Sequence, residues 1–202
     1  VKTISDKPAI GICGSGMIDL ASVLFLSGMI DIRGKFVKEK CRGRFFEKGG
    51  IKYFILVDKD VSGIEGPICL SQVDLNSLTS SKAAMYTILE VIVNKTAGLA
   101  FEDLEKFYVA GTFGSFIDPK SAISIGMLPE MDMGKFEVLE NSSLGGATLL
   151  LTNAGAFEKI LKIRQGITYI ELNVNSGFMN MFSGAKFYPH TDCSRFSSVK
   201  TD

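Results

Sequence analysis

The sequence contains no tryptophan and a single histidine, His190, among its 202 residues. One imidazole gives little support for a Ser-His-Asp arrangement or for a metal site built on histidines. The four cysteines, Cys13, Cys41, Cys69 and Cys193, form no Cys-x-x-Cys pair and no cluster with zinc or ferredoxin spacing. We therefore expect free, mostly buried thiols and no metal ion held by this chain.

Neither sign of charge is in excess, because 22 Lys and Arg residues balance 22 Asp and Glu residues. A balanced charge argues against nucleic-acid and membrane-surface partners, both of which favour a basic excess. In the strongly apolar segment 17–32, Asp19 and Asp31 flank a core shorter than the about 20 residues that cross a bilayer. The N-terminus is polar, with Pro8 ahead of the first apolar segment, and lacks the pattern of a signal peptide. The sequence predicts a cytoplasmic protein that contacts neither nucleic acid nor membrane.

The apolar fraction of 46% is ample for a hydrophobic core, and the length fits one large domain or two small ones. No internal repeat and no low-complexity linker divides the chain. Helix-like and strand-like segments alternate after a short β-like region, which is typical of an α/β domain with a mostly parallel sheet. We predict a single domain over residues 1–202, with a small antiparallel β insertion near residues 33–70.

The expected elements follow from apolar spacing and from capping residues. Helices are expected over residues 17–28, 120–125, 144–152, 156–165 and 177–184, with a longer second helix that runs through residues 82–93 and stops near Gly98. Strands are expected over residues 34–37, 50–57, 68–70, 107–110, 136–139 and 167–172. Ser71 or Asp74 lies near the start of the second helix, and a basic turn around residues 38–48 separates the first two strands. The strands at 107–110 and 136–139 are expected to be buried, and the small residues 145–147 to pack closely on the sheet.

One stretch, residues 107–119, has the pattern of a strand, a glycine turn and a helix start in that order. An apolar run is broken at Gly111 and Gly114, and Asp118 and Pro119 then cap and open a helix. Such a turn places a ligand crevice at the carboxyl end of a sheet, and glycines let the backbone approach a flat or anionic ligand. The alternative interpretation of this stretch alone is a tight turn without a ligand.

A second glycine turn, Gly-Ile-Cys-Gly-Ser-Gly at residues 11–16, leads directly into an apolar helix. Free backbone N–H groups and the helix dipole favour an anion at such a helix start. The stretch lacks the Lys-Ser/Thr ending of a phosphate-binding P-loop and does not match Gly-x-Gly-x-x-Gly. A simple helix entry is therefore the competing interpretation.

Six motifs, taken in order, resemble one family. They read Gly-Ile-Cys-Gly-Ser-Gly-Met-Ile-Asp at 11–19, Lys-Ala-Ala at 82–84, Ala-Gly-Thr-Phe-Gly-Ser-Phe at 110–116, Ile-Gly-Met-Leu-Pro at 125–129, Asn-Ser-Ser-Leu-Gly-Gly-Ala at 141–147 and Phe-Tyr-Pro-His-Thr-Asp at 187–192. The set resembles the C-terminal half of the reductive activators of corrinoid proteins. Those are ferredoxin-containing ATPases of the actin, sugar-kinase and Hsp70 superfamily, and the resemblance covers nearly the whole chain.

The resemblance implies an α/β fold, the second lobe of an actin-like, ribonuclease H-like ATPase, with the turn at 110–116 as the adenosine motif. It implies that Lys82 lies where relatives place a polar side chain over the ribose and adenine. The full cofactor-binding set that it implies is Lys82, Gly111, Thr112, Phe113, Gly114, Ser115, Gly14, Ser15 and Gly16. The implied cofactors are ATP or ADP with Mg²⁺ in the full-length protein, and a [2Fe–2S] cluster in an N-terminal domain. The implied partner is a corrinoid protein or a corrinoid iron–sulfur protein, with a homodimer as a further option.

Two features of the family are not found in this sequence. It has no Asp-x-Gly-x-Ser/Thr phosphate hairpin, which the superfamily uses to hold Mg²⁺ and the nucleotide phosphates, and no plant-type cysteine cluster. We identify no catalytic residue. The 202 residues alone are therefore expected to fold, to bind nucleotide weakly at most and to hydrolyse ATP negligibly. In the intact protein, nucleotide binding would gate electron transfer from the iron–sulfur cluster to the corrinoid cobalt.

Two other functions stay open on the sequence alone. Phe178, Met179, Met181 and Phe182 share one helical face and suit a dimer or partner interface of a domain without nucleotide, with a core stripe as the competing explanation. Cys13 of two subunits would help to hold an interfacial [4Fe–4S] cluster only with a second thiol nearby, which the sequence does not place. We expect Cys13 to be structural, packed at a helix start.

Overall fold

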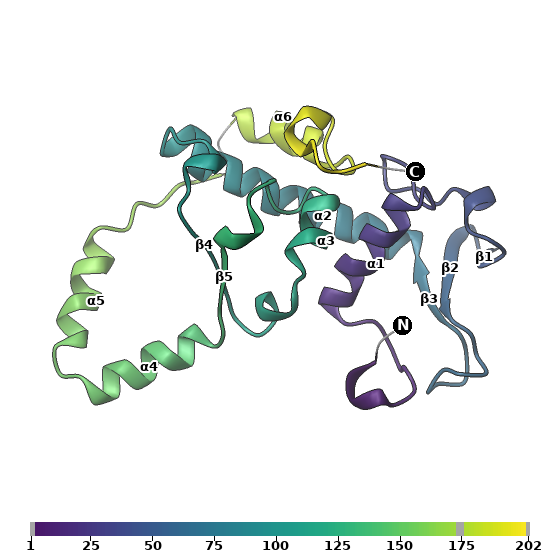
Figure 1. Ribbon diagram of the computed structural model, residues 1–202, viewed down its shortest axis with the longest axis horizontal. Coiled ribbons are helices and arrows are strands. Elements are labelled where there is room, and N and C mark those ends of the chain that lie inside the picture. Colours follow the sequence, from purple (N-terminus) through teal and green to yellow (C-terminus); the bar gives the residue numbers. More distant parts are fainter. Residues whose placement is uncertain (1–2, 173–175, 201–202) are drawn as a thin grey trace.

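The computed structural model describes residues 3–172 and 176–200, arranged around one long helix, α2 (Gln72–Glu90) (Figure 1). Ser71, one of the two residues predicted near its start, is the N-cap of this helix. The N–H of Asp74 donates to the Ser71 hydroxyl at 3.1 Å, and the N–H of Ser71 donates to the Asp74 carboxylate at 2.9 Å. This capping box satisfies two backbone donors at once and fixes where the helix starts. A π-helical turn, Val91–Thr96, continues the helix beyond Glu90.

A three-stranded antiparallel sheet lies at one end of α2 (Figure 1). Its strands are β1 (Phe45–Lys48), β2 (Ile51–Val57) and β3 (Ile68–Ser71), in that order. The small antiparallel region is thus present, but the strand predicted at 34–37 is wrong, since only an isolated bridge joins Ile30 and Phe36. Gly49 and Gly50 have φ of +59° and +75°, which closes a two-residue hairpin and pairs β1 with β2 instead.

A separate two-stranded parallel sheet is formed by β4 (Phe107–Ala110) and β5 (Phe136–Leu139). Both strands were predicted, but their predicted burial is wrong. On one face the rings of Phe107 and Phe136 pack at 5.2 Å, whereas Tyr108 is 57% exposed on the other face. The expected mostly parallel sheet is also wrong, because three strands are antiparallel and only two are parallel in the described part of the chain.

The remaining helices are α1 (Gly14–Leu26), α3 (Pro119–Ser124), α4 (Ser142–Thr152), α5 (Ala156–Gln165) and α6 (Ser176–Ala185). Their starts follow the predicted caps at two places. The Asp118 side chain accepts from the Lys120 N–H at 3.2 Å, and Asn141 accepts from the Leu144 N–H at 3.0 Å. Local capping therefore locates these helices. Among the described residues, no helix is both long and apolar enough to span a membrane.

Helices α4 and α5 form an arm that projects away from the other elements (Figure 1). The close packing predicted for α4 is wrong: a Cβ added at Gly145 or Gly146 would meet no atom within 4 Å. Leu151 is 89% exposed, and Ala156 is the one buried residue of the two helices. Residues 167–171 form no strand, because the arm leads the chain away from any strand edge with which it could pair.

The main core lies where α1, α2 and α3 meet residues 185–200, which we call the C-terminal segment. Its largest fully buried side chains include Tyr188, Phe196, Ile18, Leu24 and Leu75. Tyr188 packs its ring against Phe25 of α1 at 5.6 Å and shares a hydrogen bond of 3.0 Å with Thr79 of α2. One C-terminal side chain thus joins both long helices.

Lys82 fastens residues 185–189 to α2. It is fully buried, and its ammonium donates to the backbone carbonyls of Ala185 at 2.6 Å, Pro189 at 3.0 Å and Phe187. The ammonium also lies 4.8 Å from the centre of the Tyr188 ring, an attractive cation–π distance. Burial lowers the pKa of Lys82 to about 7, and the three carbonyl oxygens oppose that shift because they accept from the protonated amine.

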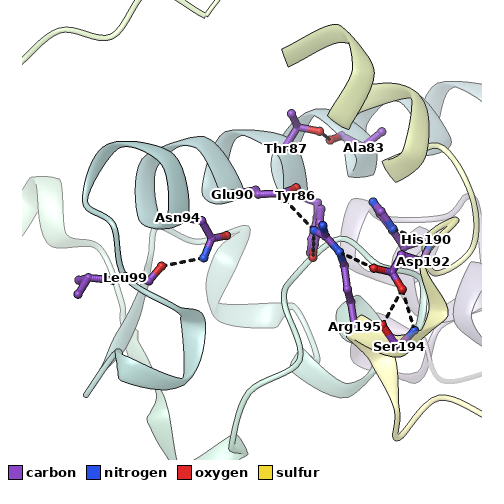
Figure 2. Close-up of polar contacts among 10 residues, drawn as sticks. All are labelled: Ala83, Tyr86, Thr87, Glu90, Asn94, Leu99, His190, Asp192, Ser194 and Arg195. Carbon is purple, nitrogen blue, oxygen red and sulfur yellow. Dashed lines mark hydrogen bonds and ion pairs between the residues drawn. The ribbon is translucent and has the colours of Figure 1, made fainter. Parts of the chain in front are cut away.

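A second set of contacts fastens residues further along the C-terminal segment (Figure 2). The Arg195 guanidinium donates to Glu90 of α2 at 2.7 Å and to Asp192 at 3.2 Å. Beside it, His190 is buried, and its Nδ1 accepts from the Asp192 N–H at 3.0 Å. Burial lowers the pKa of His190, so this imidazole is neutral near pH 7.

We predict that Lys82→Met lowers the free energy of unfolding by about 2–4 kcal/mol, because three buried carbonyl oxygens lose their donor. The measurement is urea unfolding of the 202-residue chain followed by circular dichroism. Lys120→Met, at an exposed lysine, is the matched control and should leave the midpoint unchanged. Equal midpoints for Lys82→Met and the wild type would contradict this account of the C-terminal segment.

Candidate functional site

The two glycine turns identified in the sequence lie against each other. A Cβ added at Gly14, the first residue of α1, would sit 2.4 Å from the ring of Phe113 in the other turn. Such a separation is far inside van der Waals contact, so glycine is what permits this approach. The contact joins the start of α1 to the end of β4, although about 100 residues of sequence separate them. Ser15 and Gly16 follow in the first turn of the same helix.

The turn after β4 is held in shape by its own backbone. Gly111 has φ of +89°, which favours glycine, and its N–H donates to the Glu140 carbonyl at 2.9 Å. The N–H and hydroxyl of Ser115 both donate to the Gly111 carbonyl at 3.0 Å. Gly114 is buried, and a Cβ there would lie 2.7 Å from Val109. The turn is therefore a preformed loop.

The outer surface of this turn is open. Thr112 is exposed, and the Phe113 ring is 56% exposed although one edge lies on Gly14. A Cβ added at Gly111 would meet no atom of the protein within 4 Å. An accessible aromatic face beside uncovered backbone suits a flat ring such as a nucleobase, which stacks on aromatic side chains. The residues present thus fit the base of a nucleotide.

Cys13 provides the N-cap of α1. Its Sγ accepts from the Gly16 N–H at 3.4 Å and lies 3.5 Å from the Ser15 hydroxyl. These two hydrogen bonds, the one from Ser15 foremost, lower the pKa of the Cys13 thiol. Cys13 lies at the helix start, as predicted, but the predicted packing is wrong, because the side chain caps the free end of the helix and is exposed.

The prediction of mostly buried thiols is wrong for the chain as a whole. All four cysteines are free, but Cys13 and Cys193 are exposed, Cys69 is intermediate and Cys41 alone is buried. Within the described ranges, no three His, Cys, Asp or Glu side chains gather as a ligand set. Cys13 therefore has no companions for a cluster among the described residues of one chain.

Asp19, one turn after Ser15 on α1, is a residue that the sequence analysis did not assign to the site. Its Oδ1 is buried and accepts no hydrogen bond within the described chain. Its charge raises the pKa of Cys13, against the larger lowering by Ser15. The 11–19 motif is the sequence signal for Asp19, because an acidic residue inside an apolar helix by itself argues only against a membrane span.

Lys82 is not part of this site. The resemblance implied a polar side chain over the ribose and adenine, yet the ammonium of Lys82 is fully buried and donates to carbonyls of residues 185–189. A donor committed to three backbone acceptors has no proton left for a ligand. The structure therefore brings together the two glycine turns and leaves Lys82 in the core.

We predict that Cys13 reacts with iodoacetamide faster than the buried Cys41, whose pKa is raised by burial. Ser15→Ala removes the main cause of the lowered Cys13 pKa and should slow its alkylation near neutral pH, with the two rates converging in alkali. Ser27→Ala, at the other end of α1, is the control. The alkylation rate of each cysteine is measured by mass spectrometry across a range of pH. If the rate of Cys13 depends on pH in the same way in Ser15→Ala as in the wild type, the prediction is contradicted.

Comparison with known proteins identifies a family model and several relatives that this chain matches. The family model described as the C-terminal domain of RACo, the ASKHA domain, matches residues 1–200. The corrinoid activation enzyme RamQ of Eubacterium limosum is 31% identical over an alignment of 182 residues that covers 85% of this chain and 30% of that protein. The [Co(II) methylated amine-specific corrinoid protein] reductase of Methanosarcina barkeri is 24% identical over 176 residues, 86% of this chain and 28% of that protein.

A solved structure gives the same answer. The reductive activator for corrinoid, iron-sulfur protein superposes with a TM-score of 0.90 at 36% identity, over 98% of this chain and 31% of that one. This chain therefore spans about a third of the length of the relatives that it matches. The predicted α/β lobe and the resemblance drawn from the six motifs are both confirmed. The chain belongs to the family of C-terminal ASKHA domains of the reductive activators of corrinoid proteins.

Proposed function

We propose that this chain is the adenosine-side lobe of an ATP-dependent reductive activator that drives low-potential electron transfer to a corrinoid protein. The observation that carries the proposal is the contact between Gly14 and Phe113, which unites the two glycine turns in one surface. The names of the relatives, a corrinoid activation enzyme and a reductive activator, support the role of the whole protein. The predicted location in the cytoplasm stays a prediction.

The chemistry of the site suits the adenosine end of ATP or ADP. The base would stack on Phe113 and lie along the uncovered backbone at Gly111 and Thr112. The positive end of the α1 dipole, at Gly14 and Ser15, would face the polar ribose and phosphate side of the ligand. Binding energy from these contacts would fix the position of the nucleotide but would not by itself catalyse hydrolysis.

The phosphates and Mg²⁺ need a different set of groups. Hydrolysis requires a metal ion and donors that neutralise charge developing on the transferred phosphoryl group. No cluster of metal-ligating side chains is found in the ranges 3–172 and 176–200. We propose that other parts of the full-length protein hold Mg²⁺ and the phosphates, and that a [2Fe–2S] cluster, which supplies the electron, is held by an N-terminal domain. The 202 residues alone would then be inactive as an ATPase.

A second candidate, a domain that mediates dimer or partner contacts without nucleotide, is favoured by the arm. Leu144, Leu151, Phe157 and Ile163 are 63%, 89%, 61% and 66% exposed, which is unusual for an apolar surface left to water. The face proposed earlier for this role, on α6, is less suitable. The Phe178 and Phe182 rings stack at 6.0 Å and are half-buried, and α6 packs on α2. Phe182 packs against the core, but Met179 is 61% exposed and none of the four residues predicted for this face is fully buried, so the structure shows only part of the competing core stripe.

We predict that Gly14→Ala in the full-length protein weakens ADP binding roughly tenfold or more, because the added Cβ displaces the Phe113 ring. The ring is more than half exposed, so it can swing outward without unfolding the domain. Gly11→Ala is the matched control, since a Cβ there meets no atom within 4 Å. Gly111→Val is a less specific test, because a φ of +89° strains any residue other than glycine and the variant would change the backbone as well as the surface.

Isothermal titration calorimetry measures the affinity, and thermal melting of both variants verifies that they are folded. Equal ADP affinity in wild type, Gly14→Ala and Gly11→Ala would show that the nucleotide does not bind at this surface. That outcome would leave the interaction-domain alternative as the better account.

A further inference from the structure

The balanced charge of the chain conceals a strong local separation. Residues 33–52, which we name the basic module, carry eight basic residues and two acidic ones, Glu39 and Glu47. The rest of the chain therefore has 14 basic and 20 acidic residues. The basic residues of the module are Arg33, Lys35, Lys38, Lys40, Arg42, Arg44, Lys48 and Lys52. Such clustering sets up a positive field over one small region of the molecule.

These charges are not neutralised within the described chain. All eight side chains are exposed. Arg44 forms an ion pair with Asp58 at 3.2 Å, and Lys35 donates to the neutral side chain of Asn76 at 2.8 Å. None of the other six basic residues has an ion pair among the residues that the structure describes. The module thus presents its charge to the surroundings.

The module has a fixed scaffold, so its charges have defined positions. The Phe36 ring stacks on Phe54 at 6.3 Å and meets the edge of Phe45 at 6.4 Å. Cys41 is fully buried, and its thiol donates to the Val37 carbonyl at 3.2 Å. A surface hollow of about 620 Å³ lies between strands β1 and β2 and the loop at residues 36–39, and it is lined in part by Lys38, Lys52 and Glu47. A rigid, charged, hollowed surface is suited to recognition.

The basic module is remote from the paired glycine turns. It follows the C-terminal end of α1, whereas the turns lie at its N-terminal end. A helix of 13 residues is about 20 Å long at 1.5 Å per residue. In Figure 1 the strands of the module stand at the opposite end of the molecule from β4 and β5. Its charge is therefore available to bind a partner other than the nucleotide.

The surface is better matched to a protein than to a nucleic acid. Glu39 and Glu47 lie among the basic residues and would repel a continuous phosphate backbone, while a protein surface can carry charges of both signs in register. The aromatic pair of the module, Phe46 and Tyr53, stacks on itself at 5.0 Å with the ring planes 10° apart. Those rings are engaged with each other and are not splayed to receive bases.

We propose that the basic module is the docking surface for an acidic face of the corrinoid protein. The inference rests on the proposed function, which identifies the partner. The charge of the module identifies where that partner binds and indicates that the attraction is electrostatic. Complementary charge accelerates encounter and orients the two proteins before contact, while leaving the affinity for nucleotide untouched. The nucleotide surface and the partner surface would thus occupy opposite ends of α1.

The test is charge reversal in the full-length protein. Lys38→Glu, Lys40→Glu and Lys48→Glu are combined in one variant. Lys95→Glu, Lys120→Glu and Lys200→Glu, at exposed lysines outside both the module and the arm, form a control with the same change in net charge. The probe is the purified corrinoid protein of the same organism in its Co(II) state, and association is followed by stopped flow at low and high salt. ADP affinity, self-association and binding to a duplex oligonucleotide are measured in each variant.

The module variant should associate with the corrinoid protein roughly tenfold or more slowly at low salt, with the deficit shrinking at high salt. The control should stay within about twofold of wild type, and ADP affinity should be equal in all three. Equal rates for the two variants would overturn the docking surface and leave the proposed function standing. So would a module variant that lost only self-association, or only binding to a duplex oligonucleotide. A wild-type protein that does not bind the corrinoid protein would overturn both proposals.

Discussion

The fold depends on a buried ammonium. Lys82 sits in the middle of α2 and donates to the carbonyls of three alternate residues, at positions 185, 187 and 189, which places Tyr188 between α1 and α2. A charge in a protein core is costly unless fully hydrogen-bonded, so this arrangement admits few alternatives. It fixes the helix pair on which both proposed surfaces depend: the start of α1 carries Gly14, and the C-terminal end of α1 leads into the basic module.

The site itself is defined by one close approach. Gly14 lets the Phe113 ring lie on the backbone of α1, and this brings a helix N-terminus beside the turn that ends β4. A helix start favours negative or polar groups, and an exposed aromatic ring favours a flat one. A nucleoside phosphate has both features in one molecule.

Features set by neighbouring residues were predictable from sequence, and features set by distant contacts were not. Ser71, Asp118 and Asn141 marked helix starts correctly, because capping is a local interaction. The exposure of β4 and β5 and the missing strand after α5 depend on which layers and edges are nearby, and no single sequence reports that. Both glycine turns were recognised, but their contact required the fold. A lysine in the core was not foreseeable, since lysine is almost never buried.

Photolabelling with 8-azido-ATP tests the central claim most directly, because it reports which residues lie next to the base. The full-length protein is irradiated with the nucleotide bound, digested, and the labelled peptides are identified by mass spectrometry, with excess ADP as competitor. Our account predicts ADP-sensitive label on the turn after β4, at Gly111, Thr112 or Phe113, or on the start of α1. Label confined to peptides outside both turns would contradict it.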